Sequence, residues 1–465
     1  MRIAGAWVRR RAIRKAAIAV MLTAFSFAPA QAQLLGHGLP GLPGLPGVSG
    51  LADPRLSLSR TEDLGNHGLV GAHQLADLRS ARLADFVRAH RDQVETDVKG
   101  YPVVRGQVVA ISPAPELLER ARAAGFEIED SSRLEGVGLT LVTLRTPAGF
   151  SAKAALARLR SIAPEGQFEL DHLFEPSGGG ASLPEAANAA AGPEGPGSSA
   201  GAQPESKAKG KVGMIDTGVA AHPALAHAPV HQRSFASGPV TPRAHGTAVA
   251  SLLVGRDARF RGADPDAELY VADVYGGGPV GGASVAIARA LDWMASNRVP
   301  VINISLVGPD DLALRMVVRA LARQGYLIVG AAGNDGPAAP PAFPASYAEA
   351  VSVTAVDDHG RVLSESGRPS HLDFAAPGAN MAAATLSGWA EVRGTSFASP
   401  LVSGQLAERL KRPDPAMAAR ARAELARSGK PLQIGGQRLL LVGLDLRTPP
   451  SRIAPRLQPL ARAGF

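Results

Sequence analysis

The chain of 465 residues contains no cysteine and carries a formal net charge of +8. The lack of cysteine excludes disulfide bridges and thiolate metal sites. Residues 1–32 contribute +6 and residues 411–465 contribute +8, so the stretch between them carries a net charge of −6. Because most of the chain is acidic, its high isoelectric point is no indication of a nucleic-acid-binding protein.

Residues 1–32 have the pattern of a secretory signal peptide. Basic residues from Arg9 to Lys15 precede an apolar stretch, 16–28, that is too short for a stable membrane span. Small residues around Gln31 are typical of a cleavage site, so we expect Gln33 to be the new N-terminus. This predicts a secreted or periplasmic protein with no stable membrane span after cleavage. The alternative is a short, uncleaved membrane anchor.

Residues 33–100 are expected to form a low-complexity spacer followed by a polar helical segment. Glycine recurs every third residue from Gly38 to Gly50, but this run is too short for a collagen triple helix. The pattern from Leu75 to His90 predicts a helix. No function is assigned to this region.

Residues 101–175 predict a small α+β domain. Short apolar strands alternate with two amphipathic helices, the second capped by Ser151, in the order β-α-β-β-α-β. This is the ferredoxin-like order, which by itself implies no function. Residues 176–208 are rich in Gly, Ala, Ser and Pro and predict a flexible, exposed linker.

Four polar residues between 209 and 412 stand at predicted strand ends or helix starts. Asp216 ends a buried strand, His245 begins an apolar helix, Asn334 follows another strand, and Ser396 precedes a long helical run. Taken singly, each has an ordinary explanation as a turn or capping residue. Such positions in a parallel sheet can nevertheless bring side chains together at one edge.

In this order, the segments IDTGV, HGTAVAS, AAGNDG and GTSFASP resemble the motifs of the subtilisin-like serine peptidase family. The resemblance covers about residues 209–412. It implies an α/β fold with a parallel sheet flanked by helices, and a secreted serine endopeptidase that is made as a zymogen. It also implies that residues 101–175 are a propeptide, which serves as intramolecular chaperone and inhibitor.

The resemblance assigns a role to each of the four residues. Ser396 would attack the peptide bond after His245 has taken its proton, and Asp216 would orient the imidazole and stabilise its charged form. Asn334 and the backbone N–H of Ser396 would bind the oxyanion of the tetrahedral intermediate. The expected reaction is peptide-bond hydrolysis through an acyl-enzyme, with polypeptide substrates and no cofactor.

The substrate is expected to bind as an extended strand, main chain against main chain. The resemblance places Gly281 and Gly282 on one wall of the cleft. The other wall and the pocket for the side chain before the cut are assigned to seven residues: Ser305, Leu306, Val307, Gly308, Ala331, Ala332 and Gly333. None of them is charged, so we predict a preference for an apolar or medium-sized side chain at that position.

Two departures from the family pattern affect these expectations. Val307 stands where relatives have glycine, which predicts a narrower pocket. Residues 255–262, where many relatives carry a calcium loop, contain three arginines that would repel a cation. We therefore predict no metal site there, with Asp264 and Asp266 solvated.

Residues 413–465 are expected to form a small C-terminal extension. A helix over 415–428 and a strand over 439–442 would precede a basic, disordered tail from residue 448.

Two alternatives to the peptidase function remain: a catalytically silent binding protein with a subtilisin fold, and a nucleic-acid or membrane binder acting through the tail. The complete set of catalytic residues argues against the first, and the acidic middle of the chain against the second.

Overall fold

The computed structural model describes residues 68–177, 210–278, 280–434 and 436–453. The predicted signal peptide, the glycine-repeat spacer and the linker after Ser177 lie outside these ranges. Among the described residues, none of the helices combines the length and the apolar character needed to cross a membrane.

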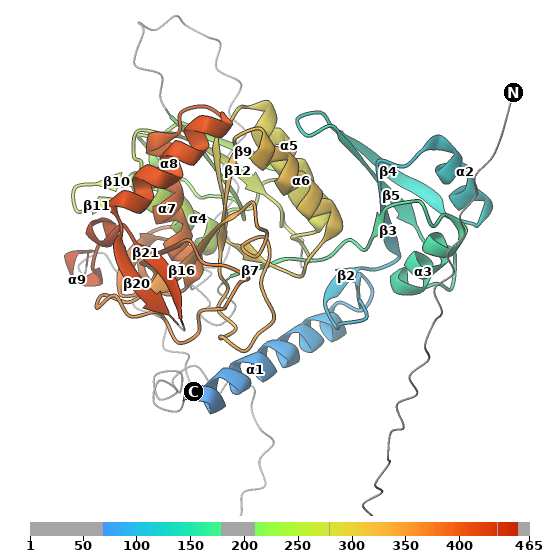
Figure 1. Ribbon diagram of the computed structural model, residues 1–465, viewed down its shortest axis with the longest axis horizontal. Coiled ribbons are helices and arrows are strands. Elements are labelled where there is room, and N and C mark those ends of the chain that lie inside the picture. The colour runs from blue at the N-terminus through green and yellow to red at the C-terminus, as the bar shows by residue number, and fades with distance from the viewer. Residues whose placement is uncertain (1–67, 178–209, 279, 435, 454–465) are drawn as a thin grey trace, which may run out of the picture. The chain divides into compact units, whose positions relative to one another are not determined.

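A nine-stranded sheet forms the centre of the larger α/β unit (Figure 1). All neighbouring strands are parallel except the hairpin at one edge. In spatial order the strands are β20 (Lys430–Ile434), β21 (Gln437–Leu441), β17 (Phe374–Pro377), β16 (Val351–Val356), β15 (Leu327–Ala331), β13 (Val301–Ile304), β8 (Lys211–Asp216), β12 (Glu268–Asp273) and β9 (Val230–Ser234). The predicted parallel sheet is thus confirmed.

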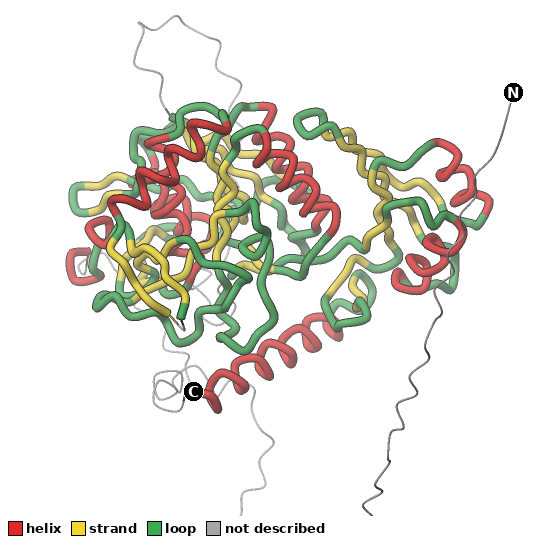
Figure 2. Tube along the Cα trace, viewed as in Figure 1, coloured by secondary structure: helices red, strands yellow, loops and turns green. Residues whose placement is uncertain are grey.

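Helices cover both faces of this sheet, as Figure 2 shows. Val212 and Met214 of β8 pack in one buried cluster with side chains of α4 (Ala244–Val254), α7 (Thr395–Arg409) and α8 (Pro415–Ser428). Ile215, on the opposite face of the strand, packs with α5 (Ser284–Ser296) and α6 (Leu312–Arg323). Burial on both faces explains why these strands read as continuous apolar runs.

The smaller α+β domain has the predicted element order. Its elements are β3 (Gln107–Ile111), α2 (Pro115–Ala123), β4 (Glu127–Leu134), β5 (Leu139–Arg145), α3 (Ala152–Ile162) and β6 (Phe168–Glu169). The sheet is antiparallel, in the order β4-β5-β3-β6. Val108 faces the domain's own helices, whereas Val109 belongs to the buried cluster of α5 and α6. Because successive side chains of β3 point to opposite faces, one face of the strand is buried inside the domain and the other against the larger unit.

A helix and a two-stranded hairpin precede this sheet, and one strand follows it. Helix α1 (Gly68–Ala89) is longer than the helix predicted from Leu75 to His90, and a hairpin of β1 (Val94–Thr96) and β2 (Pro102–Val104) comes next. Strand β7 (Glu175–Pro176) ends the domain and pairs with β14 (Leu306–Val307) of the larger unit. The predicted linker therefore begins with a paired strand.

Short elements complete the larger unit. They are the 3₁₀ helices η3 (Pro223–Leu225) and η4 (Leu444–Leu446), the hairpin strands β10 (Arg256–Asp257) and β11 (Phe260–Arg261), the hairpin strands β18 (Met381–Ala384) and β19 (Trp389–Val392), and helix α9 (Pro450–Ile453).

The C-terminal elements differ from the expected appended extension. Strand β21 pairs with β17, so the hairpin after residue 413 completes the main sheet. The disorder expected from residue 448 onward is wrong for residues 448–453. Ile453 is fully buried, and the carbonyl of Thr448 accepts a hydrogen bond from Ala382 N over 2.9 Å. The prediction was based on the composition of the whole basic tail, in which a single buried apolar residue, Ile453, has little weight.

Candidate active site

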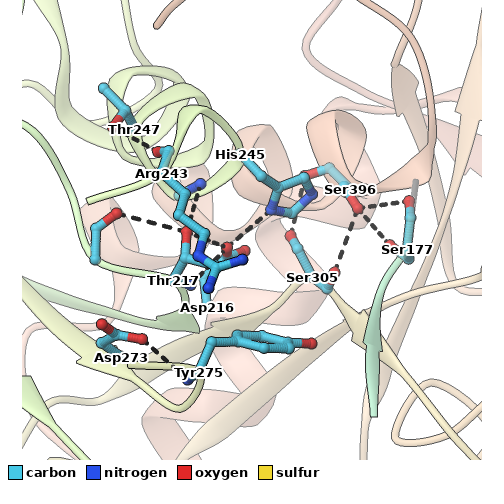
Figure 3. Close-up of polar contacts among 12 residues, drawn as sticks. Ser177, Asp216, Thr217, Arg243, His245, Thr247, Asp273, Tyr275, Ser305 and Ser396 are labelled. Atoms are coloured by element: carbon cyan, nitrogen blue, oxygen red, sulfur yellow. Dashed lines mark hydrogen bonds and ion pairs between the residues drawn. The ribbon is translucent and has the colours of Figure 1, made fainter. Parts of the chain in front are cut away.

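Asp216 and His245 form a hydrogen-bonded pair at the carboxyl end of β8 (Figure 3). Nδ1 of His245 donates to Oδ1 of the fully buried Asp216 over 2.8 Å. Gly246 lets α4 approach this closely, because a Cβ there would lie 2.5 Å from the carbonyl oxygen of Thr217. Nε2 of His245 has no hydrogen-bond partner within the described part of the chain, so it is available to take a proton.

Ser396 lies buried in the first turn of α7, where the helix N-terminus favours developing negative charge. Its hydroxyl donates to the carbonyl oxygen of Ser177 over 2.6 Å and lies 2.5 Å from the Oγ of the same residue. Gly394 precedes the helix with φ at 133°, and a Cβ there would lie 2.9 Å from Nδ2 of Asn334. Only glycine fits between the amide and the serine turn.

Asn334 binds the same carbonyl oxygen from another element. Its Nδ2 donates to the carbonyl of Ser177, and its Oδ1 accepts from the backbone N–H of Thr395 over 2.9 Å. The second bond fixes the orientation of the amide, so that the NH₂ group faces the carbonyl. Asn334 and Ser396 therefore converge on one peptide carbonyl, that of Ser177.

Residues 172–177 run as an extended strand through this cleft, bonded on both sides. On one side the N–H of Phe174 donates to the carbonyl of Gly282 over 2.8 Å. On the other side β7 pairs antiparallel with β14, and the N–H of Ser177 donates to the carbonyl of Ser305 over 2.9 Å. The chain thus occupies its own cleft in the extended form expected of a substrate.

The predicted substrate-binding residues divide into three kinds. Ser305 and Leu306 contact the strand through their backbone, and Ala331 is buried in β15 and is not among the residues that line the pocket. The remaining four line a small pocket beside the strand: Val307, Gly308, Ala332 and Gly333. Gly308 also makes room for Phe174, since a Cβ there would lie 2.5 Å from Cδ1 of that ring.

The expectation that this pocket carries no charge is wrong. Asp335 lines it, together with Glu175 and Arg79. The prediction considered the strand before Asn334 but not the turn after it, and that turn directs the carboxylate of Asp335 to the pocket rim.

Helix α1 binds this rim through two arginines. Nη2 of Arg82 lies 3.0 Å from Glu175 Oε2 and 3.1 Å from Asp335 Oδ1, and Nε of Arg79 lies 3.2 Å from Asp335 Oδ2. Leu83 of the same helix lines the pocket and is almost fully buried. Arg82 therefore connects the strand in the cleft to the turn that follows the amide of Asn334.

Two acidic side chains of the smaller domain lie at helix N-termini of the larger unit. Asp171 Oδ1 accepts from Ser284 Oγ over 3.0 Å and from Val285 N over 3.1 Å at the start of α5, which has no side-chain cap of its own. Glu169 Oε2 accepts from Leu312 N over 3.3 Å at the start of α6. Carboxylates at these positions satisfy free N–H groups and interact favourably with the helix dipole.

His172 lies buried between carboxylates of both domains. Its Nδ1 is 2.9 Å from Oδ2 of Asp311, which is fully buried and caps α6, and its Nε2 is 3.6 Å from Oδ2 of Asp97. Burial alone would lower the pKa of His172, but its hydrogen bonds to Asp311 and Asp97 raise it to about 10. His172 is therefore a cation at neutral pH.

Asp264 and Asp266 follow the segment where many relatives carry a calcium loop, and each lies near a basic residue. Asp266 pairs with Arg256 over 2.6 Å, and Asp264 lies 3.7 Å from Lys411. Asp264 is buried rather than solvated, contrary to the expectation. No cluster of three or more potential metal ligands occurs among the residues that the structure describes. The lack of a metal at this position remains a prediction.

Several residues at this site were not predicted from the sequence. The occupant of the cleft, Phe174 to Ser177, was divided by the domain boundary drawn at residue 175. The sequence before the glycine-rich linker has no pattern that marks these residues as the occupant of a cleft. No local pattern distinguishes Arg82 from the other arginines of the polar helix α1.

The Subtilase family profile matches residues 207–435. An alkaline protease of Alkalihalobacillus alcalophilus is 36% identical over 205 residues, which cover 42% of this chain and 53% of the relative. Subtilisin Savinase of Lederbergia lenta is also 36% identical over 205 residues, and here 74% of the relative is covered.

The chain spans only about half the length of the first of these relatives. Among solved structures, fervidolysin from Fervidobacterium pennivorans, described as a keratinolytic enzyme related to subtilisin, gives a TM-score of 0.58 at 19% identity. That match covers 74% of this chain and 61% of fervidolysin, and it shows the fold alone. With the profile match and the identity to Savinase, the chain belongs to the Subtilase family of serine proteases.

Proposed function

We propose that the protein is a secreted serine endopeptidase, made as a zymogen that cuts its own chain between Ser177 and Gly178. Ser396 attacks the carbonyl carbon of Ser177, His245 takes the hydroxyl proton and later gives it to the leaving amine, and Asp216 orients the imidazole. Asn334 and the N–H of Ser396 hold the oxyanion. The mature enzyme would then act on other polypeptides, outside the cytoplasm.

One observation carries this proposal: the Ser177 carbonyl lies against both the nucleophile and the amide donor. The strand that leads to it is bonded to both walls of the cleft. An inhibitor that ends in this strand would remain bound after the cut as a product. The helix-capping carboxylates Glu169 and Asp171 suit the second expected role, a chaperone that helps α5 and α6 to form.

The inhibitory region extends, in this proposal, to residues before the ferredoxin-like domain. Arg79 and Arg82 bind α1 to Asp335 beside the pocket. Helix α1 would hold the product strand in place after cleavage. This gives residues 68–89 a function that the sequence did not indicate.

Replacing Arg82 by glutamine is expected to shorten the lag before the full-length protein hydrolyses an added peptide. The variant loses ion pairs to Glu175 and Asp335 in which the arginine side chain is about a third exposed, so we expect an effect of about 3- to 10-fold on release. The matched control is Arg88→Gln, because Arg88 pairs only with Asp85 of the same helix in the described structure. Equal lags for the two variants would contradict the proposal that α1 holds the product strand in place.

Release of the cut pro-region is expected to become easier as the pH rises from about 6.5 toward 10. Release separates His172 from Asp311, so the raised pKa of about 10 belongs to the assembled state. Assembly is therefore stabilised fully below the ordinary histidine pKa of about 6.5, and the contribution is lost as the pH approaches 10.

The carboxyl groups around His172 do not reverse the expected dependence of pro-region release on pH. Burial raises the pKa of Asp171 to about 6 and raises that of Glu169, while Asp97 has a lowered pKa. The test is gel filtration of the self-cut protein at pH 6.5 and pH 10. The N-terminal fragment should co-elute with the mature part only at the lower pH, and His172→Gln should weaken this pH dependence. Co-elution that is equal at both pH values would contradict the prediction.

Labelling with a fluorophosphonate tests the activity itself. The purified self-cut protein should be labelled once, at Ser396, and Ser396→Ala should not be labelled. Protein that has lost its pro-region and still fails to react would favour the alternative, a silent binding protein with the same fold.

A further inference from the structure

Besides the Ser177 carbonyl, the cleft strand has a second backbone acceptor, the carbonyl of Phe174, that a side chain of the larger unit binds. Phe174 donates its N–H to the carbonyl of Gly282, and in a regular antiparallel pair the N–H of Gly282 would return the bond. That N–H instead donates to the carbonyl of Val274 over 2.8 Å. The carbonyl of Phe174 therefore depends on another donor.

Tyr275 supplies that donor. Its phenol donates to the carbonyl oxygen of Phe174 over 2.7 Å, a normal length for such a bond. Figure 3 shows Tyr275 in the same region of the cleft as Asp216 and Ser177. Gly282 leaves space for the contact, because a Cβ there would lie 2.2 Å from the Phe174 carbonyl oxygen and 3.1 Å from the Tyr275 hydroxyl.

The tyrosine is held in position by its own backbone. Tyr275 N and Gly276 N both donate to Oδ1 of Asp273, each over 2.9 Å, at the end of β12. Burial, and after it the charge of Asp216, raises the pKa of the Tyr275 phenol well above its ordinary value. A raised pKa favours the protonated phenol, which is the form that donates the hydrogen bond.

We propose that Tyr275 is a substrate-positioning residue, whose phenol binds the carbonyl of the fourth residue before the cut. This inference rests on the proposed function, because it takes residues 174–177 as the image of a bound substrate. Its consequence is a dependence on substrate length: a substrate that reaches this carbonyl gains a hydrogen bond that a shorter one lacks. Removing the donor of such a part-buried bond leaves the carbonyl without its hydrogen bond.

The test uses the self-cut enzyme and its Tyr275→Phe variant on two p-nitroanilide substrates. In acetyl-Ala-Pro-Leu-p-nitroanilide the acetyl carbonyl takes the place of the Phe174 carbonyl, whereas acetyl-Pro-Leu-p-nitroanilide ends one residue short. The variant should lose about tenfold in kcat/KM on the longer substrate, mainly through KM, and little on the shorter one.

The outcomes separate this inference from the proposed function. Equal losses on the two substrates, or no loss on either, would overturn the role of Tyr275 while the enzyme remains a peptidase. If the wild-type enzyme cuts neither substrate and its cleft is shown to be free of the pro-region, the proposed function itself fails.

Discussion

Replacing Ser396 by alanine is expected to lower kcat for peptide hydrolysis by about six orders of magnitude. The loss is this large because the variant has no hydroxyl to form the acyl-enzyme, and the base and the oxyanion donors then have no nucleophile to assist. The same variant should leave the full-length chain uncut after Ser177. Turnover of a chromogenic peptide measures the first effect, and intact mass measures the second.

Ser403→Ala provides the matched control for this experiment. Ser403 lies on the same helix, two turns further along, and donates to Oδ1 of Asn303 over 3.0 Å rather than into the cleft. This variant should keep its activity within a few-fold. If both variants lose activity alike, the loss reflects damage to α7 rather than removal of a nucleophile.

Replacing Asn334 by alanine is expected to lower kcat by about 10²–10³ with a smaller effect on KM. The amide NH₂ group binds the carbonyl of Ser177, and the charge on that oxygen grows in the transition state. The residual activity should come from the remaining expected donor, the N–H of Ser396. Initial rates over a range of substrate concentrations separate the two parameters.

Asn334→Asp distinguishes oxyanion binding from a structural role. An aspartate could still accept from the N–H of Thr395, as Oδ1 of Asn334 does over 2.9 Å, but it has no donor for the oxyanion. The aspartate variant should therefore be at least as impaired as the alanine variant. Activity restored by aspartate would mean that Asn334 only holds the turn before Ser396.

The sequence was most informative for segments whose local residue pattern reflects their buried position in the fold. The apolar run that ends in Asp216 predicted a central strand, because only a strand covered on both faces is apolar throughout. The four motif residues could be assigned because their types and their order are specific. Ser177, by contrast, is an ordinary serine beside a glycine-rich linker, and only the pairing of β7 with β14 brings it to Ser396.

The remaining features depend on contacts between segments that are distant in the sequence. Arg82 meets Asp335 across 253 positions of the chain, and His172 meets Asp311 across 139. Neither pair has a local signal. Strand β21 was expected as an appended element because its pairing with β17 is likewise invisible in the local pattern.

The first N-terminus that appears when the purified full-length chain matures tests the central claim most directly. A time course of intact masses and N-terminal sequences should show a fragment that begins at Gly178, in the wild type and not in Ser396→Ala. A first cut at any other bond, or the same cut in the Ser396→Ala chain, would contradict a zymogen that holds its own Ser177 carbonyl ready for attack.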